Sequence, residues 1–143
     1  VMRVVIVSGG FDPIHSGHIN HFIEAKKLGD ILIVGLNSDE WLTRKKGKPF
    51  LPINERLAVV KSMRMVDSAV AFNDDDNSSI SLIKQALVLF DDVLFANGGD
   101  RTQDNIPEID VFDKDPRVQF AFGVGGTHKQ NSSSWILKQW NST

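Results

Sequence analysis

The feature that most constrains the fold of this chain is a glycine-rich turn with a strand pattern before it and a helix pattern after it. Residues 3–7 form an almost uninterrupted β-branched run, which is typical of a strand buried on both faces of a parallel sheet. From Ile19 onward, apolar residues recur at helical spacing with charged residues between them. Residues 9–18, Gly-Gly-Phe-Asp-Pro-Ile-His-Ser-Gly-His, therefore connect a strand to a helix. In an open α/β sheet such a turn lies at the carboxyl edge, where ligands bind.

The rest of the chain repeats this alternation of strand and helix patterns. Further strands are expected at residues 30–36, 66–72, 92–96 and 117–122. The pattern predicts an α/β fold, namely a Rossmann-like, doubly wound sheet of five parallel strands. A chain of 143 residues is long enough to bury one core and too short for a second catalytic unit, so we expect one domain over residues 1–143.

Composition argues against several classes of function. The net charge of -2 disfavours general nucleic-acid binding, which needs an excess of basic residues. The absence of cysteine excludes disulfides and thiolate zinc sites. No apolar run approaches the roughly 18 residues that a membrane span needs, and the chain starts directly with a strand pattern instead of a signal peptide. We therefore expect a cytoplasmic protein with no membrane partner.

Two histidines, His15 and His18, lie on either side of Gly17 at the start of the expected helix. Both imidazoles can reach the same small volume, and a helix N-terminus there favours an anion. Two hydrogen-bond donors at that position suit a polyphosphate and can stabilise charge on a phosphoryl group as pyrophosphate leaves. Solvated histidines or a metal site are the alternatives, although zinc usually takes three or four protein ligands and no third ligand stands nearby.

The ten-residue turn resembles the nucleotide-binding signature of the HxGH nucleotidyltransferases, the cytidylyltransferase-like superfamily. Its members include glycerol-3-phosphate cytidylyltransferase, the adenylyltransferase domain of ADP-heptose synthase and pantetheine-phosphate adenylyltransferase. The resemblance implies transfer of a nucleoside monophosphate from a nucleoside triphosphate to an acceptor phosphate, with release of pyrophosphate. It implies catalytic roles for His15 and His18. The turn residues that it places at the nucleotide are Gly9, Gly10, Phe11, Asp12 and Gly17.

Two basic motifs follow in the order that the family shows. Residues 44–49 predict a basic loop at the ligand-binding edge, and the resemblance implies that Lys46 acts in catalysis, with Lys48 close to a phosphate. A solvated basic loop is the alternative. Glu55-Arg56 at a helix start also resembles the family, and Arg56 is expected to grip an acceptor or nucleotide phosphate. An ordinary surface arginine is the alternative for this residue.

Two motifs complete the resemblance near the C-terminal end. Gly98 and Asp100 belong to a glycine turn after the fourth strand, where the family contacts the nucleotide; a plain strand-exit turn is the alternative. Residues 101–116 have no clear periodicity and are expected to form an acceptor-side loop. The serines that open the last helix provide a cap and hydroxyl donors, and the resemblance places them at the terminal phosphates. These serines are Ser132, Ser133 and Ser134.

The substrate stays open between CTP and ATP, and between a sugar or polyol phosphate and phosphopantetheine. Residues 127–131 replace the Arg-Thr-Glu-Gly-Ile of glycerol-phosphate cytidylyltransferases, which weakens an assignment to CTP. The resemblance implies Mg²⁺ carried by the triphosphate, with Asp12 as the first candidate ligand, and a homodimer. Two other hypotheses are a non-catalytic nucleotide-binding module and a fragment of a class I aminoacyl-tRNA synthetase, which would also need a KMSKS-like loop and a basic surface.

Overall fold

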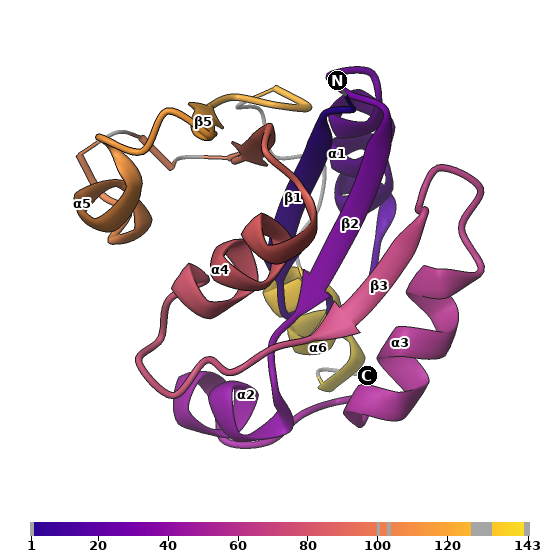
Figure 1. Ribbon diagram of the computed structural model, residues 1–143. Helices are drawn as coiled ribbons and strands as arrows, with labels where there is room; N and C mark the ends of the chain where they lie inside the picture. The colour runs from indigo at the N-terminus through magenta and orange to yellow at the C-terminus, as the bar shows by residue number, and fades with distance from the viewer. Residues whose placement is uncertain (1, 100, 103, 127–132, 142–143) are drawn as a thin grey trace.

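The computed structural model describes residues 2–99, 101–102, 104–126 and 133–141, and it confirms the expected α/β fold (Figure 1). All strand pairs are parallel, and the five strands lie in the order β3-β2-β1-β4-β5. The strands are β1 (Val4–Gly9), β2 (Ile31–Leu36), β3 (Ser68–Ala71), β4 (Val93–Ala96) and β5 (Val118–Ala121). The chain moves outward from β1 to β3 and then returns to β4, so the order reverses beside β1. Ligands bind at such a switch point, at the carboxyl ends of the strands.

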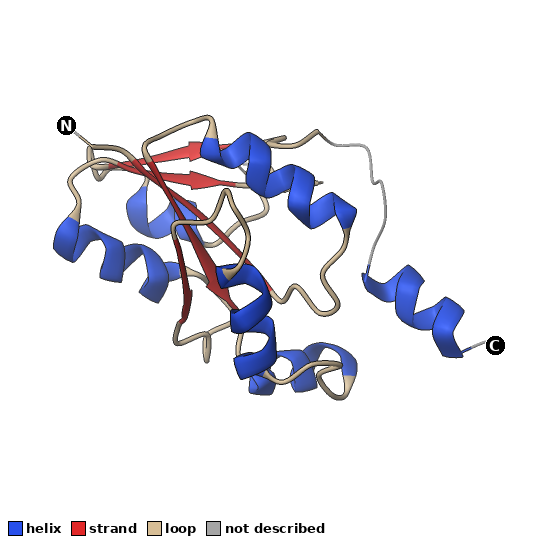
Figure 2. Ribbon diagram, turned by 90° about the vertical axis from the view of Figure 1, so that its right-hand side faces the viewer, coloured by secondary structure: helices blue, strands red, loops and turns tan. Residues whose placement is uncertain are grey.

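Helices cover both faces of the sheet, as Figure 2 shows. Helices α1 (Ser16–Lys26) and α3 (Ile53–Lys61) pack on one face, and α4 (Ile80–Leu89) and α5 (Glu108–Phe112) on the other. Successive β1 side chains point to opposite faces, so Val5 and Val7 join the first core while Val4 and Ile6 join the second. All four valine and isoleucine side chains are fully buried, as the β-branched run predicted.

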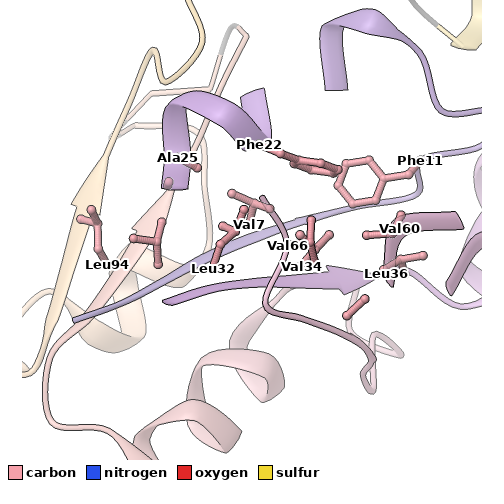
Figure 3. Close-up of a cluster of buried hydrophobic side chains, with 13 residues drawn as sticks. Val7, Phe11, Phe22, Ala25, Leu32, Val34, Leu36, Val60, Val66 and Leu94 are labelled. Atoms are coloured by element: carbon pink, nitrogen blue, oxygen red, sulfur yellow. The ribbon is translucent and has the colours of Figure 1, made fainter. Parts of the chain in front are cut away.

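The core beneath α1 continues directly into the glycine-rich turn. Phe22 of α1 is fully buried, and its ring meets the Phe11 ring at a centroid distance of 5.0 Å (Figure 3). Burial of such a side chain contributes about 1.5 to 3 kcal/mol. The turn is therefore anchored in the same hydrophobic cluster that fixes α1 on the sheet.

The structure corrects the prediction that residues 44–49 form a basic loop. Arg44, Lys45 and Lys46 are the last turn of helix α2 (Asp39–Lys46). Ser38 caps this helix by accepting a hydrogen bond from the Trp41 backbone N–H. Acidic residues lie in its first turn and basic residues in its last, which complements the helix dipole. The helix has eight residues and a single buried one, Leu42, so its sequence shows little periodicity.

The segment 101–116, predicted as a loop without periodicity, contains the short helix α5. Its Phe112 is buried, as is Ile106 just before it, so this segment closes the second core. The last helix, α6 (Ser133–Asn141), has no buried residue. Among the described residues, no helix has the length and apolar character needed to cross a membrane.

Candidate functional site

His15 and His18 cap the N-terminus of α1 reciprocally. The Nδ1 atom of His15 accepts from the Gly17 backbone N–H at 3.0 Å, and the Nδ1 atom of His18 accepts from the His15 backbone N–H at 3.2 Å. The two rings stack with their centroids 3.8 Å apart. The structure therefore brings together the two histidines that the sequence placed at one edge, and the backbone of the helix start holds both rings.

These two hydrogen bonds also determine where each neutral imidazole carries its proton. An Nδ1 atom that accepts a hydrogen bond has no hydrogen, so the proton lies on Nε2 and makes that atom a donor. Burial, together with the neighbouring His15 and His21, lowers the pKa of His18 to about 3. His18 is therefore a neutral Nε2–H donor at neutral pH, not an imidazolium.

Phe11 supports this arrangement from inside the protein. It is 6% exposed, and its ring makes edge contacts with His18 and Phe22, each at a centroid distance of 5.0 Å. Its φ angle is 52°, a value that residues other than glycine rarely adopt and that clusters at functional sites. The predicted nucleotide contact of Phe11 is thus limited to its backbone, because its side chain belongs to the core.

The paired glycines before Phe11 allow close packing inside the protein. A Cβ atom on Gly9 would lie 2.9 Å from the Phe11 ring, and one on Gly10 would lie 2.9 Å from the Leu42 side chain. Both distances are too short for real carbon contacts, so larger residues would displace the Phe11 ring or the Leu42 side chain. From the sequence, Gly9 and Gly10 were expected to let the backbone approach a ligand closely. The structure shows that side chains inside the protein also require glycine at these two positions.

Asp12 fastens the segment after α2 to the turn. The residue is 2% exposed, and its carboxylate accepts from the backbone N–H groups of Phe50, at 2.6 Å, and Leu51, at 2.7 Å. Lys46 at the end of α2 donates to the Asp12 backbone carbonyl and pairs with the Asp12 carboxylate at 3.3 Å. The structure therefore places Lys46 directly beside the histidine turn. Lys48 is exposed on the segment that follows.

Asp12 fits the predicted role of a magnesium ligand poorly. Each of its oxygens already accepts a backbone hydrogen bond, and Lys46 provides its counter-charge. Within the part of the chain that the structure describes, no group of three or more His, Cys, Asp or Glu side chains is arranged to hold a metal ion. These contacts give Asp12 a role in holding the loop, and a Mg²⁺ ion carried by a triphosphate would find few ligands in this segment.

Arg56 lies in a different environment from the one that the sequence suggested. It is 1% exposed, and its guanidinium donates to the backbone carbonyls of Leu51, Gly10 and Asn37 at 2.9, 3.0 and 2.7 Å. A fourth bond of 2.6 Å reaches the Asp39 carboxylate. With four donors engaged by protein acceptors, Arg56 joins the turn, the end of β2 and α2, and this geometry does not support the predicted grip on a phosphate.

Cations from two segments gather at the same edge. Burial, followed by the charges of Arg101 and Lys46, lowers the pKa of Lys45. The ammonium of Lys45 also lies 4.6 Å from the centre of the Trp41 ring. The end of α2 and the loop after β4 therefore both bring positive charge to this edge, which favours a polyanionic ligand. Arg101 was not among the site residues predicted from the sequence, because it belongs to none of the motifs.

A second interaction missed by sequence reasoning joins α1 to the turn after β5. The side chain of Asn20 donates to the Gly125 carbonyl at 2.9 Å, and Nδ1 of His21 lies 2.8 Å from the Val124 carbonyl oxygen. Gly98 is close by, because a Cβ atom there would lie 3.0 Å from the same His21 nitrogen. The one hint in the sequence that His21 belongs to the site is its spacing, because His15, His18 and His21 recur every three residues.

The predicted serines are placed only in part. Ser133 at the start of α6 donates its hydroxyl to the Pro13 carbonyl at 2.7 Å, so this end of α6 reaches the histidine turn. Ser134 is exposed on the same helix. Three predictions fall outside the described residues, namely those for Asp100, Ser132 and the segment 127–131.

Comparisons with known proteins agree with the fold. A family model described as cytidylyltransferase-like matches residues 6–111. The bifunctional protein HldE of Geobacter sulfurreducens is 32% identical over 139 residues, which are 95% of this chain and 27% of that protein. HldE of Nitratiruptor sp. is 35% identical over 127 residues, which are 87% of this chain and 26% of that protein. The chain thus spans about a quarter of the length of the curated relatives that it matches.

Two solved structures resemble the chain. The lipopolysaccharide core biosynthesis protein from Thermoplasma volcanium is similar with a TM-score of 0.67 and 27% identity, over 85% of this chain and 96% of that one. A bifunctional NMN adenylyltransferase/ADP ribose pyrophosphatase from Francisella tularensis has a TM-score of 0.63 at 12% identity, over 100% of this chain and 43% of that one. At that identity the second likeness shows the fold alone.

Proposed function

Because the chain belongs to the cytidylyltransferase-like family, we propose that it transfers a nucleoside monophosphate from CTP or ATP to a phosphorylated small molecule and releases pyrophosphate. The observation that carries this proposal is the reciprocal capping of His15 and His18, which fixes two imidazoles as Nε2–H donors at a helix N-terminus. Hydrogen-bond donors held in this way stabilise charge that develops on a phosphoryl group without reorganising during the reaction.

The reaction needs positioning and charge stabilisation and no covalent enzyme intermediate. An oxygen of the acceptor phosphate attacks the α-phosphorus in line, and the bond to the leaving pyrophosphate breaks. His15 and His18 donate hydrogen bonds to the transferring group, and Lys46 neutralises the triphosphate from the side of α2. Exposed Lys48 and Ser134 lie on the segments that would contact outer phosphates. Magnesium enters with the nucleotide as part of the substrate, and we assign it no ligand from this chain.

We propose a sugar phosphate or polyol phosphate as the acceptor. The likeness to the lipopolysaccharide core biosynthesis protein covers 96% of that chain, which supports a sugar-type acceptor over phosphopantetheine. The two HldE relatives, together with the resemblance of the motif order to ADP-heptose synthase, favour ATP and a heptose phosphate as a specific form of this proposal. We further propose that the protein is cytoplasmic and that it forms a homodimer. Sedimentation of the purified chain would test the dimer.

The deciding experiment measures pyrophosphate release with Mg²⁺ from CTP and from ATP separately, against sugar phosphates, polyol phosphates and phosphopantetheine. Release that depends on one nucleotide and one acceptor would identify the base and the acceptor class together. Release only with phosphopantetheine would replace the sugar phosphate proposal. Nucleotide binding with no release across the panel would favour a non-catalytic module, which is the second candidate.

A further inference from the structure

We propose that His21 is a positioning residue of the nucleotide site, which fastens the glycine turn after β5 to helix α1. The inference rests on the proposed function, because it concerns how that site is held. His21 lies one helical turn beyond His18, on the helix that the HxGH segment opens. It therefore connects the histidine turn with the loops that follow the two strands on the other side of the switch point, β4 and β5.

Two neighbouring side chains of α1 engage two neighbouring carbonyls of this glycine turn. The Nδ1 atom of His21 lies 2.8 Å from the Val124 oxygen, and Nδ2 of Asn20 donates to the Gly125 oxygen at 2.9 Å. A carbonyl oxygen can only accept, so His21 must carry its proton on Nδ1. This tautomer is the opposite of the one that the capping pair imposes on His18.

Glycines make room for His21 on two sides. A Cβ atom on Gly98 would lie 2.9 Å from the Val124 oxygen and 3.0 Å from Nδ1 of His21. A Cβ atom on Gly125, whose φ angle is +86°, would lie 3.0 Å from the His21 Cα. The loop after β4 and the turn after β5 therefore both close on His21. A larger side chain at Gly98 would displace the imidazole, and one at Gly125 would displace the α1 backbone at His21.

The turn also depends on the rest of the carboxyl edge for its position. The Val124 backbone N–H donates to the Asn97 carbonyl at 3.0 Å, and the Gly126 N–H donates to the Gly123 carbonyl at 2.9 Å. These backbone bonds define the shape of the turn, whereas the bonds from His21 and Asn20 set its distance from α1. Burial, opposed by the hydrogen bond to Val124 and assisted by the charge of Arg101, lowers the pKa of His21 and keeps the imidazole neutral.

Two substitutions separate the hydrogen bond from the bulk of the side chain. His21→Phe keeps a planar ring and removes the donor, whereas His21→Asn places an amide N–H close to where Nδ1 lies. We expect His21→Phe to raise the Kd and the KM for the nucleotide about tenfold, as expected for the loss of one hydrogen bond to a partly buried carbonyl, with kcat within about twofold. We expect His21→Asn to restore the Kd to within about twofold of the wild type. Ile23→Asn is the matched control, because Ile23 is 40% exposed on the same helix.

Nitrogen-15 spectra of the imidazoles supply a readout that does not require activity. His21 should show a protonated Nδ1, whereas His18 should show a protonated Nε2. A protonated Nε2 on His21, or His21→Phe binding the nucleotide as tightly as the wild type, would overturn the positioning role. If His21→Phe and His21→Asn were equally weak while Ile23→Asn was normal, the hydrogen bond would not be the cause and the inference would fail.

Failure of the proposed function has a different signature. A wild-type chain that binds neither CTP nor ATP in calorimetry would contradict the function directly, and the positioning role with it. A wild-type chain that binds and turns over nucleotide alongside an indistinguishable His21→Phe would contradict the inference alone.

Discussion

The histidine turn, residues 9–18, and the basic arm, residues 39–51, meet at the same sheet edge but use polar side chains in opposite ways. In the histidine turn the His18 imidazole is neutral, and backbone N–H groups orient both histidine rings. The charged groups that connect the basic arm to its surroundings, or that lie on it, divide into two sets. Asp12 binds the arm to the turn, and Arg56 of α3 joins both to the end of β2, while Lys46 and Lys48 keep exposed surface.

The difference separates two tasks of a phosphoryl-transfer site. Groups that stabilise developing charge must be fixed before the reaction, which favours neutral donors locked by local backbone geometry. Groups that attract a polyanion must keep their charge, which favours solvent access, since burial of a cation lowers its pKa, as it does for Lys45. Four predictions test this comparison, from the largest expected effect to the smallest.

Removing Arg56, the buried arginine that joins the arm to the end of β2, should have the largest effect, on stability. Arg56→Leu leaves the Asp39 carboxylate and three backbone carbonyls without their donor. The free energy of unfolding should fall by about 3 kcal/mol, because each buried polar group left without its partner costs about 1 to 3 kcal/mol, whereas the Asp39 side chain, 34% exposed, can turn to water. Chemical denaturation of the wild type and of Arg56→Leu measures this difference in the free energy of unfolding. A stable Arg56→Leu protein with weakened phosphate binding would instead support the original prediction that Arg56 grips a phosphate.

The next largest effect should come from the histidine turn, on the rate. His18→Asn can still accept from the His15 N–H but has no Nε2–H donor, whereas His18→Ala loses both. We expect kcat to fall about 10²- to 10³-fold in each variant, as for loss of one preorganised donor. Only His18→Ala should lose an additional ~1 kcal/mol of stability, from the lost cap. Full pyrophosphate release by His18→Asn would contradict the role of the HxGH pair.

The neutral state of His18 also predicts how stability depends on pH. Its pKa is about 3 in the folded protein, against 6.5 for the ordinary group, so below pH 6.5 the unfolded chain binds a proton that the folded chain does not. Stability from this group is therefore complete above pH 6.5 and is lost as pH falls toward 3. At pH 5.5 the loss amounts to about 1.4 kcal/mol. Denaturation measured at about pH 8 and at about pH 5.5 should show a correspondingly smaller drop in stability for His18→Asn. An equal drop in both proteins would mean that other groups cause it.

The comparison also explains how much of the molecule could be predicted from its sequence. The parallel sheet was predictable because short apolar runs such as β1, whose side chains enter both cores, are typical of strands in a parallel sheet. The histidine pair was predictable because its geometry is local, with one helix start placing both rings. The contacts of Arg56 and Asp12 could not be predicted, because their hydrogen-bond partners come from segments far apart in the chain. The contact between His21 and Val124 joins residues 103 positions apart, which no local pattern reports.

The basic arm should show the smallest effects, and they should appear in substrate binding. Lys46 is held beside the turn by Asp12, whereas Lys48 is exposed one residue past Gly47. Lys46→Ala should therefore raise the KM for the nucleoside triphosphate about tenfold, the lower range for a charge-assisted hydrogen bond. Lys48→Ala should raise it only about twofold, as for an exposed charge. Because exposed charges are screened more strongly, added salt should remove the Lys48 effect first. A larger effect for Lys48 than for Lys46 would mean that the phosphates bind beyond the end of α2, away from the histidine turn.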